Sequence, residues 1–497
     1  MKNILIAIVF TALCVSVHAQ SVNIEPIELK GVDMSNALNA TVVGARDGLN
    51  IVVTNYGWSN NSPLGSGIVI YGIDANGKVQ KKLLVSKERE CTLVTATAVG
   101  DTVYMLATGF EKGGLFDFYR LKADLNNWNV VGTAQTFYKH KNSKSDWIDW
   151  TVAASPDKHI LAIAIQEYAE SSRIAKVFGK KDEEVDALFA MDNRLNILWQ
   201  RDDLPGWYNS LIVDDDETVH SLLAGAGNER TYFIFANHRS FGDEIFVDSL
   251  DRTDIQACRL LNCTDGHFVA GGTLGEDRRG LRNTQYSGMF ALAYNSKTGK
   301  LTFNRMTFNE TEVATFNNVA TSERLAEREV EGLSIGKGSP TPFGGILQLC
   351  DKMVKIIVQN GIHSYYYYLN GSLMAAIDTN ANFLWRVPIR NGLCSTDNQS
   401  LINQTVIFEN GKTLVLQTES SRNSTSYNNT DKVHVFMSMT SPKSMVAVYS
   451  IDSNGTTTKT TWPTGKAFYL AGNPHRIDDN LFFTIVARKK VTAIRLK

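Results

Sequence analysis

Eight segments of the chain repeat one pattern of hydrophobic and polar positions. In each, an apolar stretch meets a turn that contains Asp or Asn, and a strand of alternating apolar residues follows. Asx side chains bond the local backbone and β-branched residues suit a half-buried strand, so each segment predicts a β-hairpin. The predicted turn residues are Asp47, Asp101, Asp157, Asp215, Asp265, Asp351, Asn410 and Asp478.

A second strand–turn–strand element follows most of these hairpins, for example at residues 68–84, 188–201 and 374–387. Two hairpins per unit predict a four-stranded antiparallel sheet. A row of such units predicts an all-β fold in which the sheets are arranged radially, as the blades of a β-propeller. We expect eight blades, with seven as the alternative. Helical periodicity is almost absent, which argues against alternating strands and helices.

The last unit stops after one strand near residues 491–496, so the C-terminal blade, residues 465–497, lacks an outer strand. The segment 23–30 contains Ile24, Ile27 and Leu29 and is predicted to supply it. That pairing would close the ring between the two ends of a single domain, residues 21–497. The alternative is a free N-terminal arm.

The first 20 residues have the regions of a signal peptide: Lys2, an apolar run over residues 4–15, and Val17-His18-Ala19 before the expected cleavage site. We therefore expect an exported protein, located in the periplasm, outside the cell or at its surface. Cys14 leaves a lipoprotein as the alternative. No later stretch has the roughly 20 consecutive apolar residues of a membrane-spanning helix.

Composition narrows the class of partner. With 43% hydrophobic and 20% charged residues the chain is an ordinary globular sequence, and its net charge of −1 gives no general attraction to nucleic acid. The cysteines of the mature chain are scattered without CxxC pairs, which argues against a zinc site and favours small buried residues, although one or two disulfides stay open. They are Cys91, Cys258, Cys263, Cys350 and Cys394.

The second hairpins resemble the blades of quinoprotein-like propellers, in which an Asp-containing turn precedes an aromatic residue. The matching pairs are Asp192 with Trp199, Asp378 with Trp385 and Asn295 with Phe303. The resemblance implies that each aromatic docks against the next blade. The stretch around Asp157 is similar to the Ser-Pro-Asp turn of WD-repeat and TolB-like blades.

Quinone enzymes of that family carry pyrroloquinoline quinone, a calcium ion, a catalytic Asp and often a vicinal disulfide. This sequence has no adjacent cysteines and no set of residues that matches the quinone pocket. We therefore predict no cofactor and no metal. The acidic run at residues 214–217 could hold calcium, but it occupies a predicted hairpin turn, where solvated acids are common.

Length variation concentrates on one face of the predicted ring, where second strands connect to third strands and one blade connects to the next. The long connections are residues 56–66, 167–184, 272–287 and 419–444. An insertion between blades, residues 309–340, contains a helix candidate, SERLAEREVEGL, with Ser322 or Thr321 as its cap. It is either a lid or partner-binding element, or a surface decoration.

Candidate binding residues lie in these connections. The first group is Arg230, Arg278, Arg279 and Arg282. Guanidinium groups suit a carboxylate, a phosphate or an acidic sugar, although neighbouring acids offer salt bridges instead. The second group is Trp58, Trp207 and Tyr208, which are expected in loops and could stack on sugar rings.

No GxSxG, HExxH or Walker motif occurs, and His159, His220 and His267 recur at equivalent positions, as structural residues of a repeat do. Whether the protein is an enzyme stays open, but a non-catalytic scaffold that binds an envelope protein or a glycan is favoured. The alternative is a secreted polysaccharide hydrolase or lyase with two or three acids at the central channel. A quinone oxidoreductase is the third hypothesis.

Overall fold

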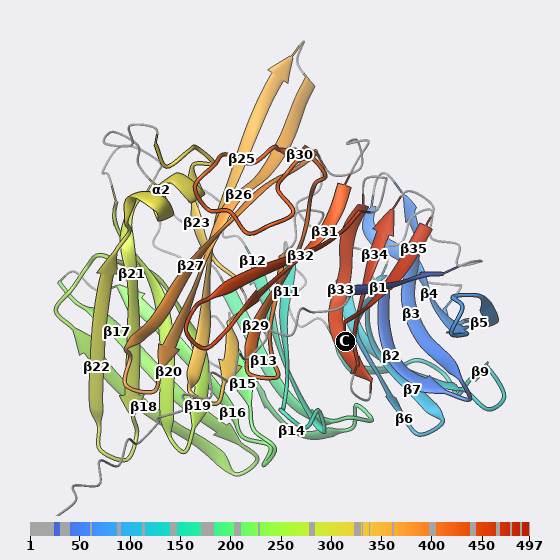
Figure 1. Cartoon of the computed structure of the whole chain (residues 1–497). Helices are drawn as coiled ribbons and strands as arrows, with labels where there is room; N and C mark the ends of the chain where they lie inside the picture. Colours follow the sequence, from blue (N-terminus) through green and yellow to red (C-terminus); the bar gives the residue numbers. More distant parts are fainter. Residues whose placement is uncertain are drawn as a thin grey trace, which may run out of the picture.

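The computed structural model describes residues 24–29, 40–59, 62–86, 91–111, 115–139, 147–169, 183–202, 210–226, 229–277, 284–322, 330, 332–336, 338–359, 362–396, 404–437, 444–463, 468–477, 480–487 and 490–496. They form an eight-bladed β-propeller, which confirms the predicted fold and excludes the seven-bladed alternative (Figure 1). Within these residues, no helix is long and apolar enough to cross a membrane.

Each of blades 1 to 4 is an antiparallel sheet whose first strand lies nearest the centre of the ring. Their strands are β2 (Ala40–Arg46), β3 (Leu49–Ser59), β4 (Ser62–Ile73) and β5 (Val79–Leu84); β6 (Cys91–Val99), β7 (Thr102–Glu111), β8 (Leu115–Asp124), β9 (Asn129–Val130) and β10 (Gln135–Tyr138); β11 (Trp147–Ala154), β12 (Ile160–Ala169), β13 (Glu183–Asp192) and β14 (Ile197–Asp202); and β15 (Leu211–Val213), β16 (Val219–Ala226), β17 (Thr231–Arg239) and β18 (Gly242–Leu250).

Blades 5 to 8 follow the same plan with more additions. Their strands are β19 (Ile255–Thr264), β20 (His267–Asp277), β21 (Thr284–Asn295) and β22 (Lys300–Thr307); β23 (Leu333–Ile335), β24 (Ser339–Thr341), β25 (Gly344–Gln359), β26 (Ile362–Asp378), β27 (Phe383–Thr396) and β30 (Phe436–Met437); β28 (Gln404–Glu409), β29 (Lys412–Ser420), β31 (Ser444–Ile451) and β32 (Thr457–Pro463); and β33 (Phe468–Ile477), β34 (Asn480–Ala487), β35 (Lys490–Leu496) and β1 (Ile24–Leu29).

Blade 8 joins the two ends of the described chain. β1 pairs antiparallel with β35, from Ile24 opposite Leu496 to Leu29 opposite Val491, and forms the outer strand of this sheet. Antiparallel pairing of the first strand with the last closes the ring by hydrogen bonds, so separating the ends requires breaking a sheet. The predicted signal peptide lies outside the described residues.

The tight turns between first and second strands gather on one side of the ring, here called the turn face, with the turns between third and fourth strands. Asp47, Asp265 and Asn410 have φ of 49°, 52° and 49°, and the glycine after each also has positive φ. Two successive left-handed residues make the two-residue turn whose twist matches a hairpin, which is why Asp-Gly and Asn-Gly stand there. Asp478 lies outside the described residues.

The prediction of a turn at Asp351 is wrong, because this residue lies inside β25. The inner hairpin of blade 6 instead turns at Pro342 and Phe343, and the predicted insertion gives way at Leu333 to the inner strands β23 and β24. The apolar residues flanking Asp351 extend the strand through a β-bulge, where its carboxylate accepts a hydrogen bond from Asn370 Nδ2 at 2.7 Å. The pairing and burial of this apolar strand therefore decide its structure, and the preference of Asp for turns does not.

The hydrophobic core lies between adjacent blades, and two of the three predicted aromatics dock there. Trp199 of blade 3 packs with Leu211 and Val213 of blade 4, and its Nε1 donates to the carbonyl of Glu217 at 3.2 Å. Trp385 of blade 6 packs in the same way against blade 7.

Phe303 differs from these two tryptophans. It stacks on Phe290 of its own blade, with ring centroids 5.4 Å apart. Its cluster joins blade 5 to the preceding blade 4, so the resemblance misplaced its contact.

The recurrent histidines each contact an asparagine at or near the end of the third strand of their own blades. His159 Nδ1 lies 2.9 Å from Asn193 Nδ2, His220 Nδ1 lies 2.7 Å from Asn237 Oδ1, and His267 Nε2 lies 2.6 Å from Asn295 Nδ2. A His–Asn contact between the start of the second strand and the end of the third thus recurs in three successive blades, which agrees with the structural role that the sequence indicated.

The five described cysteines are free thiols, and all except the half-buried Cys258 are buried. Burial raises the pKa of the Cys258 thiol to about 12, and raises the pKa of the Cys263 thiol as well. These thiols stay protonated at neutral pH, as expected of small residues that fill a core.

Candidate functional site

Of the predicted binding residues, Arg230 alone has a described side chain. It is exposed, and its Nε lies 2.7 Å from Asp251 Oδ1, so it forms a surface salt bridge. Trp58 was predicted in a loop, but its backbone lies in β3 opposite Gly65 of β4, because the hairpin strands extend into the predicted connection. The others lie outside the described residues: Arg278, Arg279, Arg282, Trp207 and Tyr208.

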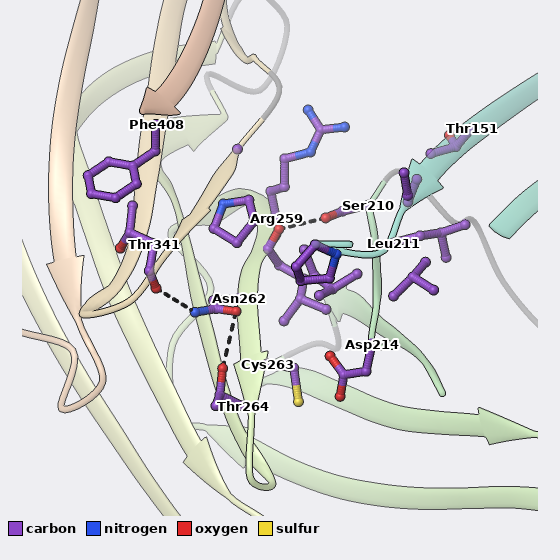
Figure 2. Close-up of a pocket in the computed structure, with 18 of the residues that line it drawn as sticks. Thr151, Ser210, Leu211, Asp214, Arg259, Asn262, Cys263, Thr264, Thr341 and Phe408 are labelled. Atoms are coloured by element: carbon purple, nitrogen blue, oxygen red, sulfur yellow. Dashed lines mark hydrogen bonds between the residues drawn. The ribbon is translucent and has the colours of Figure 1, made fainter. Parts of the chain in front are cut away.

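The first strands of blades 3 to 7 surround a cavity of about 600 Å³ in the central channel (Figure 2). Backbone and small or aliphatic side chains form most of its wall. Two side chains brace it: Ser210 Oγ donates to the carbonyl of Leu260 at 2.6 Å, and Asn262 Nδ2 donates to the carbonyl of Thr341 at 3.0 Å. These contacts tie blades 4, 5 and 6 together around the channel.

Two charged residues line this cavity. Arg259 donates to the carbonyl of Gly336, and burial lowers the pKa of its guanidinium. Asp214 Oδ2 lies 2.9 Å from His220 Nε2. The hydrolase or lyase hypothesis requires two or three acids at the channel, and the described lining brings one carboxylate there, already bonded to a histidine.

The acidic turn at residues 214–217 is held together by protein groups. Asp215 Oδ1 accepts a hydrogen bond from the backbone of Asp157 at 3.2 Å, and Asp216 Oδ1 accepts one from the backbone of Thr218 at 3.1 Å. Across the described ranges, no three His, Cys, Asp or Glu side chains lie together as metal ligands. These acids stabilise the turn.

Blade 4 also contains a Ser–His–Asp row, which deserves comparison with a hydrolase triad. Ser221 Oγ lies 2.9 Å from His238 Nε2, and His238 Nδ1 lies 3.0 Å from Asp243 Oδ1. The hydroxyl and the imidazole are each only 3% exposed, and neither residue lines the channel cavity. Burial lowers the pKa of His238. Without access for a substrate, the row joins the three outer strands of the blade.

The face opposite the turn face, here called the loop face, carries the connections between second and third strands and between blades. A helix, α2 (Glu310–Phe316), begins the connection from blade 5 to blade 6. Asn309 caps it: Asn309 Oδ1 accepts from the backbone of Glu312, whose carboxylate accepts from the backbone of Asn309. The spacing Asn-x-x-Glu is a capping box, and it was the sequence signal that could have located this helix.

The predicted helix SERLAEREVEGL lies mostly outside the described residues, and its expected caps have other roles. Thr321 follows α2, and its backbone donates to the carbonyl of Thr430 in the connection from β29 to β31 at 2.8 Å. The backbone of Val433 in turn donates to Asn318 Oδ1 at 3.0 Å, and Asn318 Nδ2 donates back to its carbonyl at 3.2 Å. Two segments about 110 residues apart in sequence are therefore docked on each other.

We call these two segments, residues 309–322 and 421–435, the blade 6–7 cap. After residue 435 the second segment pairs in parallel with β27 through β30, at Leu393 opposite Phe436. Tyr427 Oη donates to the carbonyl of Pro388 at 2.9 Å, and burial raises the pKa of this phenol to about 12. A loop that begins in blade 7 is thus fastened to blade 6 along its length.

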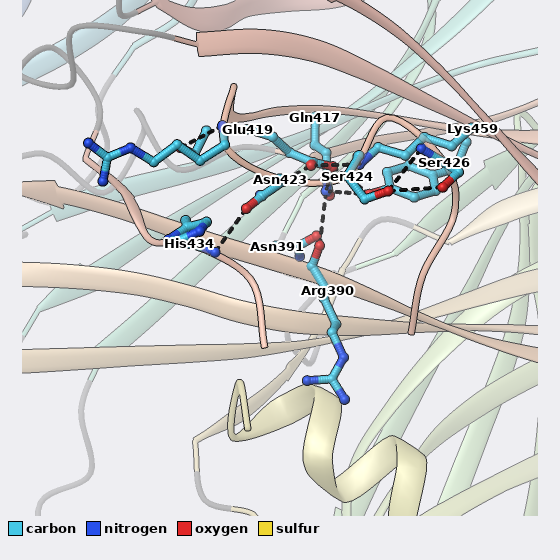
Figure 3. Close-up of polar contacts among 12 residues, drawn as sticks. Arg390, Asn391, Gln417, Glu419, Asn423, Ser424, Ser426, His434 and Lys459 are labelled. Carbon is cyan, nitrogen blue, oxygen red and sulfur yellow. Dashed lines mark hydrogen bonds and ion pairs between the residues drawn. The ribbon is translucent and has the colours of Figure 1, made fainter. Parts of the chain in front are cut away.

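A buried arginine on β27 fixes both segments of the cap. Arg390 is only 2% exposed and points toward α2 (Figure 3). Its guanidinium donates to the carbonyls of Val319, Ala314 (3.4 Å) and Asn429 (3.0 Å). Arginine suits this place because its planar fork can serve several backbone oxygens at once.

A chain of buried amides continues from this point across the boundary between blades 6 and 7. Gln348 Nε2 donates to Gln404 Oε1 at 2.7 Å, and Gln404 Nε2 donates to Gln417 Oε1 at 2.7 Å. Gln417 Nε2 donates to the carbonyl of Arg390 at 3.2 Å and to Glu419 Oε1 at 2.8 Å. Such a network is stabilising only when its members are satisfied, and here each link has a partner.

This row of hydrogen-bonded amides ends at Glu419, whose side chain is fully buried. Lys459 Nζ lies 2.8 Å from its Oε2, Asn423 Nδ2 donates to the same oxygen at 3.3 Å, and the Tyr449 hydroxyl donates to Oε1. Burial and the adjacent carboxylate raise the pKa of Tyr449 well above its ordinary value, so it remains a donor. Lys459 also donates to the carbonyl of Ser424 at 2.7 Å, which ties the cap to β32.

A polar cavity of about 180 Å³ lies between this end of the network and the cap. Its wall includes basic, amide and hydroxyl groups from residues 422–434, with Tyr449 and Lys459 below them. Figure 3 shows Asn423, Ser424 and Ser426 at the end of the network. Sequence reasoning named the long connection 419–444 but none of the residues that line this cavity.

Comparisons with known proteins add the fold alone. No protein-family model matches the chain, and no curated protein matches it. Solved structures with a similar arrangement include polysaccharide lyase Uly1 (11% identity, TM-score 0.39, 95% of this chain and 98% of that one) and the WD40 domain of SCAP from fission yeast (10%, 0.35, 95% and 98%). A subtype N10 neuraminidase-like protein of the strain A/little yellow-shouldered bat/Guatemala matches at 9% identity and TM-score 0.31, over 71% of this chain and 99% of that one.

Proposed function

We propose that the protein is an exported, non-catalytic binding propeller that holds a glycan or protein partner on the loop face of blades 6 and 7. The observation that carries this proposal is the blade 6–7 cap, which is fixed from below by the buried Arg390. A surface that is ordered before its ligand arrives loses little conformational entropy on binding. Long connections held on a rigid scaffold are where propellers and other repeat folds place their binding residues.

The central channel gives less support to a hydrolase or lyase. Asp214 is the acid that the described lining supplies, and it is already bonded to His220. General acid–base cleavage of a glycosidic bond uses two carboxyl groups at a defined separation. The proposal therefore places the ligand on the cap and not in the channel.

Blocking the cap tests this function. Ser426 is exposed and lines the cap cavity, so Ser426→Trp should fill the cavity without disturbing the ring. The matched control is Thr379→Trp, an exposed position on the turn face of the neighbouring blade 6. Both proteins are screened beside the wild type against arrays of oligosaccharides and purified envelope proteins.

We expect at least one ligand of the wild type to bind Ser426→Trp at least tenfold more weakly and Thr379→Trp with unchanged affinity. Circular dichroism and melting of each variant show whether the propeller is intact. A ligand that binds Ser426→Trp as tightly as the wild type, or that is lost instead from a channel variant such as Arg259→Met, would overturn the proposal. So would the absence of any ligand across both arrays.

A further inference from the structure

The cavity in the blade 6–7 cap has more positive than negative charge available to a ligand. Arg422, Lys432 and Lys459 line it. Lys459 is committed to the buried Glu419 at 2.8 Å. Arg422 and Lys432 are exposed, and neither side chain has an ion-pair partner among the described residues.

One acid stands in the described wall of the cavity. Asp431 Oδ2 accepts a hydrogen bond from Asn428 Nδ2 at 2.9 Å. Two cationic side chains without an ion-pair partner and one carboxylate leave one excess positive charge at this cavity. Arginine can bind a carboxylate through two parallel hydrogen bonds, and a lysine beside it adds a point charge.

The neutral polar groups of the cavity wall can form hydrogen bonds with the hydroxyl groups of a ligand. Ser424 Oγ lies 2.9 Å from Ser426 Oγ and accepts from the backbone of Ser426 at 3.2 Å. Hydroxyls both donate and accept, so this pair can exchange its mutual bond for bonds to a polyhydroxylated ligand. A volume of about 180 Å³ lies below the 300–1,000 Å³ typical of pockets for drug-sized molecules. The cavity therefore suits one ring of a longer ligand.

The floor of the cavity is already fixed. Asn423 is only 8% exposed; its Oδ1 accepts from the backbone of His434 at 2.8 Å, and its amide donates to Glu419. These bonds hold the two ends of the 421–435 loop at one separation. The basic side chains consequently project from a rigid frame, which favours recognition of a defined shape over general attraction of anions.

We propose that this cavity binds a carboxylate-bearing sugar residue of an acidic glycan. Arg422 and Lys432 hold the carboxylate, and Ser424 and Ser426 bind the ring hydroxyls. The inference rests on the binding function proposed above and names the ligand class for the same surface.

Calorimetry with the full chain tests the inference. The probes are trimers of galacturonic acid, glucuronic acid and N-acetylneuraminic acid, each compared with its methyl ester, which has nearly the same shape and no charge. We expect at least one acidic trimer to bind, and its ester to bind at least tenfold more weakly. Because the contact is ionic and exposed, the affinity should also fall as salt is raised.

Variants assign the contact to its residues. Arg422→Gln and Lys432→Gln should each weaken binding of the acidic trimer about tenfold, and the pair together should weaken it further. The control is Lys297→Gln, which removes one exposed positive charge from a turn of blade 5. Its affinity should equal that of the wild type.

The outcomes separate this inference from the function on which it rests. Equal binding of acid and ester, unchanged affinity in both variants, or displacement of the trimer by inorganic phosphate at similar concentration would overturn the acidic-sugar assignment. A neutral glycan or a protein that binds the cap and is lost in Ser426→Trp would leave the loop-face function standing without it. A ligand indifferent to Ser426→Trp would overturn both.

Discussion

Blades 6 and 7 are held together in different ways on their two faces. On the turn face a single side chain organises each turn: Asp378 Oδ1 accepts from the backbones of Asn380 and Asn382 at 2.8 and 2.7 Å, and Asp452 Oδ1 does the same for its turn. On the loop face, Arg390 reaches carbonyls 39 to 76 residues away. The turn face is stabilised locally, and the loop face by buried charges that bridge distant segments.

This difference predicts that mutations on the loop face lower the free energy of unfolding more than mutations on the turn face. Removing an Asx side chain frees backbone groups that water can reach. Removing a buried charge leaves its partners without water or protein, which costs far more than the net value of the bond itself.

The largest effect is expected for Arg390→Met. The change leaves the buried carbonyls of Val319 and Asn429 without their guanidinium donor, and each unsatisfied acceptor costs about 1–3 kcal/mol, so we expect the free energy of unfolding to fall by about 2–5 kcal/mol. Asp378→Ala on the turn face should lose about 1 kcal/mol. Chemical denaturation of both variants measures the difference, and equal losses would contradict the contrast between the faces.

A similar loss is expected at the other end of the buried network. Glu419→Gln deprives the buried ammonium of Lys459 of its counter-ion and should cost about 3 kcal/mol. In the double variant Glu419→Gln, Lys459→Met both charges are gone, so part of the loss should be recovered. A double variant that loses the sum of the two single effects would show that the ions are not coupled.

The third prediction concerns pH, because the pKa of a turn carboxyl and the pKa of a carboxyl buried in a strand are shifted in opposite directions. Backbone hydrogen bonds from Lys78 and others lower the pKa of the turn residue Asp74, whereas burial raises the pKa of Asp351 to about 7. The folded chain therefore retains a proton on Asp351 that the unfolded chain releases near its ordinary pKa of 3.8. Stability contributed by this group is present below about pH 4 and is lost as the pH rises towards 7.

Replacing Asp351 by Asn keeps a partner for Asn370 and removes the titration. We expect Asp351→Asn to be more stable than the wild type by about 4 kcal/mol at pH 8 and nearly equal to it at pH 4. Thermal melts over this range make the comparison. A gain that is independent of pH would contradict the assignment to the Asp351 carboxyl.

The smallest effects are expected at equivalent turn positions of blades 6 and 7. Ala381 and Gly455 both have left-handed backbones, with φ of 63° and 82°. Ala381→Gly relieves the strain of a Cβ there but also removes a methyl group that is buried in the core, so the two effects nearly cancel and stability should change by less than about 0.5 kcal/mol. Gly455→Ala should destabilise by at least about 1 kcal/mol, because its Cβ would lie 2.8 Å from Trp385 Cβ. Melting curves of both variants make the comparison, and a loss in Ala381→Gly as large as that in Gly455→Ala would contradict this prediction.

The same contrast explains what the sequence could predict. Turn chemistry and alternation act within a few residues, so the eight blades and the turns at Asp47, Asp265 and Asn410 could be identified without a structure. Asp351 misled for the same reason: its local pattern is that of a turn, and only the pairing with β26 shows that it is buried.

The loop face depends on contacts that leave no periodic signal. Nothing near Arg390 indicates that its partners lie in and after α2 and in the 421–435 loop, and the sequence around Glu419 has the pattern of an ordinary strand end. The available hint was the presence of two arginines, Arg386 and Arg390, in a strand that begins with an apolar pattern. The length of the connections located the region, but only the fold shows which segments meet.

Hydrogen–deuterium exchange on ligand binding tests the central claim most directly. With the best-binding member of the arrays at saturation, we predict that protection is gained in residues 421–435 and 309–322, while the channel strands β11, β15 and β19 exchange as in the free protein. Protection confined to the channel strands, with the blade 6–7 cap unchanged, would contradict the claim that this protein binds its partner on the loop face.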